Sequence, residues 1–131
     1  MRPCPDAESF RSTADVNADV ALVHSPKVRA CFQQLMRSQA KSELPAGTTV
    51  DSLLTHITAD PAGAPRNVIA TVDTTIEVRV SGQSVVVYMN SALIIGPLLE
   101  AEIDFTNAGE PVPAALREQL TKKVADRAAR A

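Results

Sequence analysis

The sequence predicts an α+β fold in which an antiparallel sheet of three to four strands, arranged as a meander, is packed by an N-terminal and a C-terminal helix. Three strand-like stretches follow one another between residues 68 and 105, and no helix-length pattern separates them. Strands joined by short turns pair antiparallel, because a parallel pair needs a long crossover connection. Amphipathic helical patterns before and after these stretches supply the two helices that cover the sheet.

Hydrophobic periodicity and turn residues define the three strands. Residues 68–80 alternate between apolar and polar side chains, which is typical of a half-buried strand. A turn at residues 81–84 leads into residues 85–95, which are apolar on both faces. This strand is therefore expected at the centre of the sheet, covered on its second face by a helix or by another copy of the chain. Gly96-Pro97 ends it, and residues 99–105 alternate again.

The helices are predicted from capping residues and from spacing. Ser25-Pro26 is a favourable helix start, and Pro45-Ala46-Gly47 ends that helix near Leu44. Its apolar stripe consists of Val28, Cys31, Phe32, Leu35 and Met36. The last helix begins at Pro113, and its stripe consists of Leu116, Leu120, Val124 and Ala128.

Residues 48–59 are ambiguous, because their apolar residues suit a helical turn while their β-branched threonines favour a strand. We predict a strand. The chain is accordingly divided into an irregular N-terminal segment, residues 1–24, and a single α+β domain, residues 25–131. A chain of 131 residues is long enough to bury about two-thirds of its unfolded surface.

Composition excludes several classes of function. The net charge is -2, whereas nucleic-acid or anionic-membrane binding needs a surplus of Lys and Arg on one face. Aromatic residues make up 3% of the chain and stand singly, so a platform for stacking bases is not expected. No apolar run reaches the roughly 18 residues of a membrane span, so no transmembrane segment is predicted.

Candidate catalytic and metal-binding groups are few. His24 and His56 belong to no metal-ligand spacing, so we expect no metal site and no cofactor. An alternating row of Glu100, Glu102 and Asp104 is interpreted as the solvent face of its strand. The basic residues Lys122, Lys123, Arg127 and Arg130 are interpreted as a solvated helix end, with a docking patch for an acidic partner or a lipid headgroup as the alternative.

The two cysteines, Cys4 and Cys31, bear on the compartment. Their pairing would close a loop of roughly 27 residues and contribute about 3 kcal/mol by loop-closure entropy. Two unrelated thiols are the alternative. The N-terminus carries no apolar stretch of the kind that a signal peptide needs. The protein is therefore either cytoplasmic or an exported domain from which the signal has been removed, and an even number of cysteines favours export.

Several local motifs, taken in order, resemble those of small exported domains of mycobacteria and related actinobacteria. They are Ser25-Pro26 followed by Val28-Arg-Ala-Cys31, the exit Leu44-Pro45-Ala-Gly47, a strand pair meeting at Gly82, Ile103-Asp-Phe105, Pro111-Val-Pro113, and a helix ending in Val124-Ala-Asp-Arg127. Envelope lipoproteins and extracellular sensor domains of serine/threonine kinases belong to this group. The resemblance implies a secreted or cell-envelope module that senses a ligand or binds a lipid or protein partner, without catalytic residues. It also implies a Cys4–Cys31 disulfide.

These observations predict a non-catalytic exported binding or sensor domain. An aliphatic groove near Val87, Tyr88, Met89 and Leu93 is expected to take an apolar small molecule, a lipid or a protein partner. One alternative is a structural or assembly protein that forms a homodimer through the sheet face. Another is a small enzyme on a cone-like α+β scaffold, which would need His56 and a carboxylate such as Asp51 to converge inside a pocket.

Overall fold

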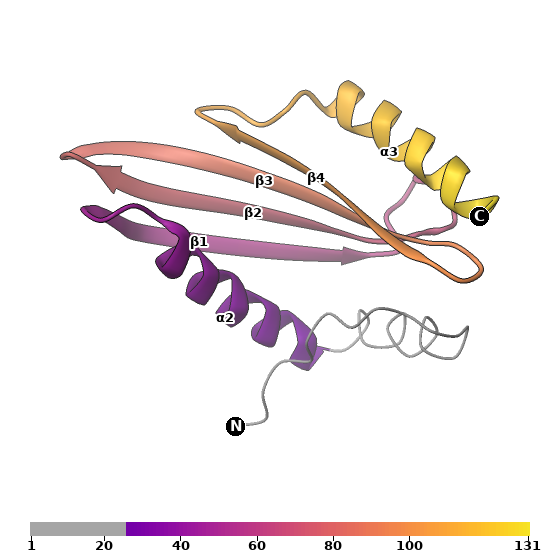
Figure 1. Cartoon of the computed structure of the whole chain (residues 1–131), viewed down its shortest axis with the longest axis horizontal. Coiled ribbons are helices and arrows are strands. Elements are labelled where there is room, and N and C mark those ends of the chain that lie inside the picture. The colour runs from indigo at the N-terminus through magenta and orange to yellow at the C-terminus, as the bar shows by residue number, and fades with distance from the viewer. Residues whose placement is uncertain (1–25) are drawn as a thin grey trace.

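A computed structural model describes residues 26–131 of the chain (Figure 1). Its elements, in chain order, are α2 (Pro26–Glu43), β1 (Thr48–Ala59), β2 (Val68–Val80), β3 (Gln83–Ile95), β4 (Glu100–Ala108) and α3 (Ala114–Ala129). The predicted segment of residues 1–24 lies outside the described residues. Within them, the predicted α+β arrangement of a meander flanked by two helices is confirmed.

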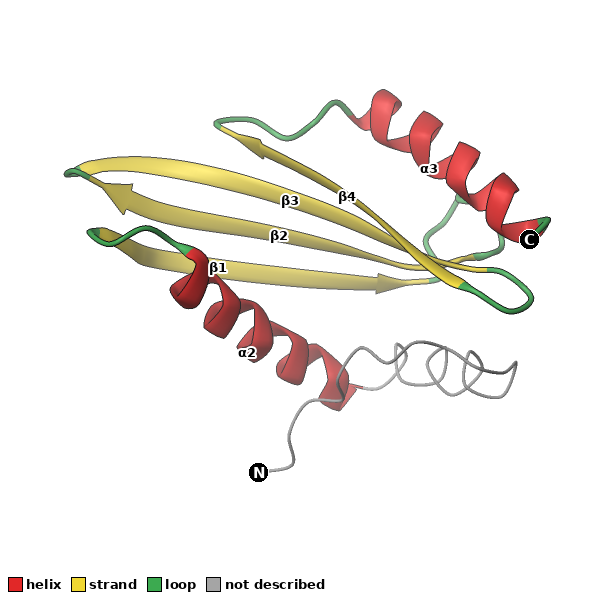
Figure 2. Ribbon diagram, in the orientation of Figure 1, coloured by secondary structure: helices red, strands yellow, loops and turns green. Residues whose placement is uncertain are grey.

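The four strands form one antiparallel sheet in the order β1-β2-β3-β4 (Figure 2). The predicted strand at residues 48–59 is present as β1, and it lies at one edge of the sheet. β3 lies inside the sheet between β2 and β4, as its two apolar faces predicted. Ser81 and Gly82 connect β2 to β3 with φ angles of 51° and 78°. Positive φ at both central residues is the type I′ geometry, whose twist matches that of the strands it joins.

Side chains of one sheet face, called here the α2 face, form two adjoining apolar clusters. The first is built around Ile57, Ala70 and Val72, and the second around Leu53 and Ile76, against which Leu44 at the end of α2 packs. Thr74 is buried on this face, and its hydroxyl is 3.2 Å from that of Thr55 on β1, so the polar group has a partner.

The opposite face of β3 and β4, called here the α3 face, packs against α3. Its cluster consists of the buried Val68, Ala92, Ile94, Ala125 and Ala128 with the half-buried Ala64, Leu99, Ala101, Ile103 and Val124. The small side chains of α3 allow a close approach to the sheet. Leu116 is 44% exposed, so the predicted stripe of this helix is wrong at its first member. The helix packs on the sheet through its C-terminal half.

Asn67 and Gly96 fix that close approach. Asn67 Nδ2 donates to the carbonyl of Ile95 at 3.1 Å and to the carbonyl of Ala125 at 2.8 Å, so one amide joins β3 to α3. A Cβ at Gly96 would clash with the Ala128 carbonyl oxygen, so only glycine leaves room for the helix there.

On α2, the structure partly departs from the predicted apolar stripe. Cys31 is half-buried, but Leu35 is 41% exposed. The side chains of Val28, Phe32 and Met36 are outside the described part of the chain. In that part, neither helix is long and apolar enough to cross a bilayer.

Candidate functional site

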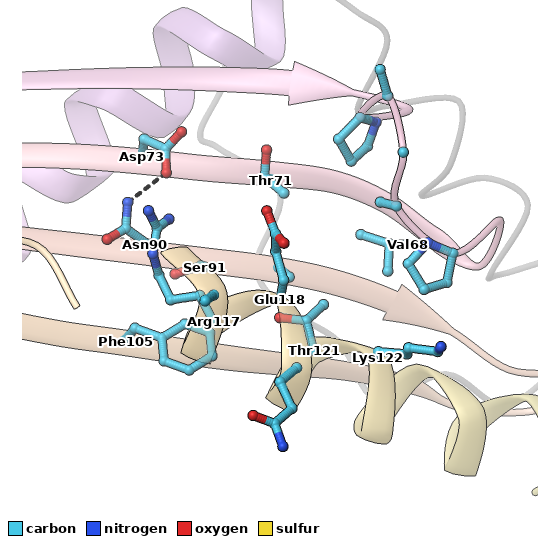
Figure 3. A pocket seen from close by; sticks show the side chains of 18 residues that line it. Val68, Thr71, Asp73, Asn90, Ser91, Phe105, Arg117, Glu118, Thr121 and Lys122 are labelled. Atoms are coloured by element: carbon cyan, nitrogen blue, oxygen red, sulfur yellow. Dashed lines mark hydrogen bonds between the residues drawn. The ribbon is translucent and has the colours of Figure 1, made fainter. Parts of the chain in front are cut away.

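A cleft of about 780 Å³ lies between the α3 face of the sheet and the N-terminal half of α3 (Figure 3). Thr71 and Asp73 of β2, with Asn90 and Ala92 of β3, form its floor. The wall is contributed by α3, and the loop of residues 61–65 closes one end. The cleft exists because α3 is held to the sheet at its C-terminal half, by Asn67 and the Gly96 contact, and not at its N-terminal half.

The end of the cleft next to the loop is apolar. Val68 and Ala92 on the strands meet Pro61, Ala64 and Pro65 of the loop. Backbone bonds hold this loop in place, because the amide of Ala64 donates to the Pro61 carbonyl at 3.3 Å and that of Val68 donates to the Pro65 carbonyl at 3.0 Å. Two prolines with fixed φ further restrict it.

The other end of the cleft is polar. Asp73 and Asn90 are opposite each other on β2 and β3, and Asn90 Nδ2 donates to Asp73 Oδ1 at 2.6 Å. Phe105 is opposite Asn90 on the next strand and adds an aromatic side chain beside the pair. Arg117 of α3 lies at this end too, half-buried, with its Nε donating to the Val112 carbonyl at 2.9 Å. Glu118 extends from α3 toward Thr71 on the floor (Figure 3).

One polar atom at this end has no partner. The Asn90 Oδ1 atom is buried and accepts no hydrogen bond from the described residues. Buried polar atoms are paired in the great majority of cases, so each exception calls for an explanation, such as a bound water or ligand.

The predicted groove residues do not line this cleft. Strand side chains alternate between faces, so Val87, Met89 and Leu93 belong to the α2 face and Tyr88 to the α3 face. All four are half-buried. Tyr88 is one row beyond the Asp73–Asn90 pair, away from the loop. The four therefore form no single surface, and a groove at these positions stays a prediction.

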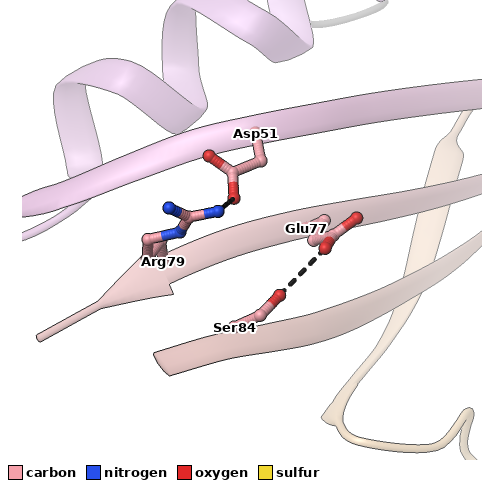
Figure 4. A network of polar contacts seen from close by, with 4 residues as sticks. All are labelled: Asp51, Glu77, Arg79 and Ser84. Atoms are coloured by element: carbon pink, nitrogen blue, oxygen red, sulfur yellow. Dashed lines mark hydrogen bonds and ion pairs between the residues drawn. The ribbon is translucent and has the colours of Figure 1, made fainter. Parts of the chain in front are cut away.

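His56 and Asp51 do not converge in a pocket. His56 is exposed, and Asp51 Oδ2 lies 3.2 Å from a guanidinium nitrogen of Arg79 (Figure 4). Ser84 donates to Glu77 at 2.9 Å close by, so the polar groups of this surface partner one another. The arrangement that the enzyme hypothesis needs is not present. His24 lies outside the described residues.

Cys31 is not a free thiol. Cys4 lies outside the described residues, so the Cys4–Cys31 pairing stays a prediction.

The acidic row of β4 shares its face with Leu93 and Ile95 of β3, because Glu102 is opposite Leu93 and Glu100 opposite Ile95. Glu102 and Asp104 are exposed, as predicted, while Glu100 is half-buried. Although the residue as a whole is exposed, partial burial of its carboxylate raises the pKa of Glu102 from its usual 4.5 to about 7, and a hydrogen bond with Asp104 and repulsion from Asp104 and Glu100 act in the same direction. Charges pointing along the core side of an edge strand are a known protection against edge-to-edge pairing.

Sequence reasoning missed the cleft residues Asp73, Asn90, Arg117 and Glu118. A signal was present in Asn90-Ser91, which interrupts an otherwise apolar central strand. The loop of residues 60–65, with two prolines, was a second signal. Within residues 26–131 no group of three His, Cys, Asp or Glu side chains could hold a metal ion.

Comparisons of the chain with protein-family models, with curated proteins and with solved structures find no match.

Proposed function

We propose that this chain is a non-catalytic binding domain whose cleft between α3 and the sheet takes up a small amphipathic molecule. The observation that carries the proposal is the cleft of about 780 Å³, since ligand pockets commonly measure roughly 300–1,000 Å³. Its apolar end would hold the body of the molecule and its polar end the head group. The resemblance to exported actinobacterial sensor and lipoprotein domains supports a role in the cell envelope.

The lining favours binding over catalysis. Nucleophilic and acid–base catalysis commonly use Ser, Cys, His, Lys, Asp or Glu held next to an activating group. Among the described residues around the cleft there is no His or Cys, and Lys122 is exposed on the helix. Ser91 is opposite Val72 and Asp104, which belong to the α2 face, and the carboxylates of the cleft, Asp73 and Glu118, are both exposed. What the cleft offers instead is an apolar surface with a few polar groups at one end, which is the usual composition of a binding pocket.

A fluorescence titration tests this proposal with N-phenyl-1-naphthylamine, a neutral apolar probe with one N–H group. We expect saturable binding with one site per chain. The variant Thr71→Trp fills the floor of the cleft and should weaken binding at least about tenfold, which corresponds to 1.4 kcal/mol. Thr75→Trp is the matched control, because Thr75 is half-buried on the same strand and the same face but does not line the cleft.

Two results would overturn the proposal: no saturable binding, or equal loss of binding in both tryptophan variants. Ala115→Trp provides a second blocking variant, since Ala115 is exposed at the rim and its replacement does not disturb the core. Its control is Ala129→Trp, on the exposed surface at the other end of α3.

A second candidate function is assembly as a homodimer. Leu54 is 69% exposed on β1, an edge strand of the sheet, and it belongs to none of the three apolar clusters. Light scattering of the wild-type chain and of Leu54→Ser tests it. A dimer that becomes a monomer on this substitution would support assembly, and a wild-type monomer across the accessible concentration range would exclude it.

A further inference from the structure

The orientation of the Asn90 amide is set by its neighbour. A carboxylate can only accept hydrogen bonds, so the Nδ2 group of Asn90 must face Asp73, at 2.6 Å. The Oδ1 atom then points away from Asp73 and finds no donor among the described residues. The hydrogen bond uses one N–H of Asn90 and leaves the exposed Asp73 carboxylate, which lines the cleft, free to accept further hydrogen bonds.

The opposite wall adds a second carboxylate. Glu118 reaches from α3 toward Thr71, which is two residues from Asp73 on the same face of β2 and therefore about 7 Å away along the strand (Figure 3). A single cationic group between floor and wall could thus approach both carboxylates.

The positive groups compensate only in part. Arg117 lies at this end, but its Nε already donates to the Val112 carbonyl. Lys122 extends toward the apolar, loop end of the cleft (Figure 3). Two carboxylates and one guanidinium leave the polar end with a net negative charge, which disfavours an anionic head group.

We propose that the molecule bound in the cleft carries an ammonium head group, held between Asp73 and Glu118, on an apolar body that lies along Val68 and Ala92. This inference rests on the proposed binding function and specifies its ligand class. A carboxylate or phosphate head would meet Asp73 and Glu118 with like charge.

Competition against bound N-phenyl-1-naphthylamine tests this ligand class with three probes that share one tail: dodecylammonium, dodecanol and dodecanoate. The two ionic probes are kept below their micellar concentrations, and dodecanol below its solubility limit. We expect dodecylammonium to displace the dye at a concentration about tenfold lower than either of the other two. If dodecanol or dodecanoate displaces the dye at the same concentration as dodecylammonium, the inference about the ammonium head group is wrong. The proposed function would still hold, because the cleft would still bind apolar molecules. If the dye does not bind in the cleft, the proposed function itself fails.

Charge-removing variants locate the effect. Asp73→Asn keeps the shape of the side chain and should remove most of the preference for dodecylammonium, while the affinity for the dye is kept. Glu118→Gln should also lower the preference for dodecylammonium. Because Glu118 is exposed on α3, this substitution does not alter a residue of the sheet. Glu77→Gln is the control, because Glu77 lies on the same strand and face outside the cleft. An unchanged preference in both cleft variants would refute the assignment.

Discussion

Asn67 is the residue whose replacement should most directly loosen α3 from the sheet. Its Nδ2 group donates to the carbonyls of Ile95 on β3 and Ala125 on α3, at 3.1 and 2.8 Å, and the amide of Ile95 donates back to the Asn67 carbonyl at 2.9 Å. Asn67→Ala removes both side-chain bonds and keeps the backbone bond. The carbonyls of Ile95 and Ala125 then lose partners in a partly buried setting.

The magnitude follows from the two bonds. A typical hydrogen bond contributes about 1 kcal/mol net, so Asn67→Ala should lower the free energy of unfolding by about 2 kcal/mol. At about 4 °C per kcal/mol for a chain of this size, Tm should fall by about 8 °C. Asn67→Asp should cost more than Asn67→Ala at neutral pH, because a carboxylate cannot donate and would face two carbonyl oxygens.

Thermal unfolding followed by circular dichroism measures both variants, and amide hydrogen exchange reports whether α3 is the part that loosens. Asn107→Ala is the control, since Asn107 is exposed on β4. The reasoning is refuted if Asn67→Ala unfolds within about 0.5 kcal/mol of the wild type, which is the usual range of a surface substitution. It is also refuted if Asn67→Asp is as stable as Asn67→Ala.

Three further predictions concern packing and charge. Gly96→Ala should lower Tm more than Gly109→Ala, because the new Cβ at position 96 would clash with the Ala128 carbonyl. At Gly109 there is open space for a Cβ, and the only destabilising effect is the backbone strain of an alanine at a φ of 88°. Equal Tm losses in the two variants would contradict this. Folding raises the pKa of Glu102 to about 7, so the folded chain binds a proton more tightly than the unfolded one between pH 4.5 and 7, and stability falls as pH rises through that window. Glu102→Gln should therefore stabilise the chain at pH 8 by about 1 kcal/mol after solvent screening, and not at pH 4, in denaturant titrations; a gain of equal size at both pH values would contradict it. Asp51→Asn removes the ion pair with Arg79, which is partly exposed to solvent, and should change the unfolding free energy by less than about 0.5 kcal/mol in the same titrations. A larger loss would mean that this ion pair contributes more to stability than its exposure predicts.

Much of the fold follows from local sequence patterns. The alternation in β2, the two apolar faces of β3 and the break at Gly96-Pro97 each predicted what the structure shows. Such patterns report which face of an element is buried. They do not report how a helix is tilted on a sheet, and so the exposure of Leu116 was not predicted.

The candidate site could not be predicted from the same patterns. Asp73 and Asn90 are 17 residues apart in sequence and meet only through the register of β2 and β3. Glu118 joins them only because Asn67 and Gly96 hold the far end of α3 to the sheet. The residues of the predicted groove are close in sequence, but the period of two in a strand places Tyr88 on the other face from Val87 and Met89.

An NMR titration of the ¹⁵N-labelled chain with N-phenyl-1-naphthylamine tests the central claim most directly, because it shows which surface the ligand contacts. The account predicts saturable shift changes at the amides of Thr71, Ala92 and Ala115, which line the cleft. Changes confined to Val87, Met89 and Leu93 on the α2 face, or no saturable changes, would contradict it.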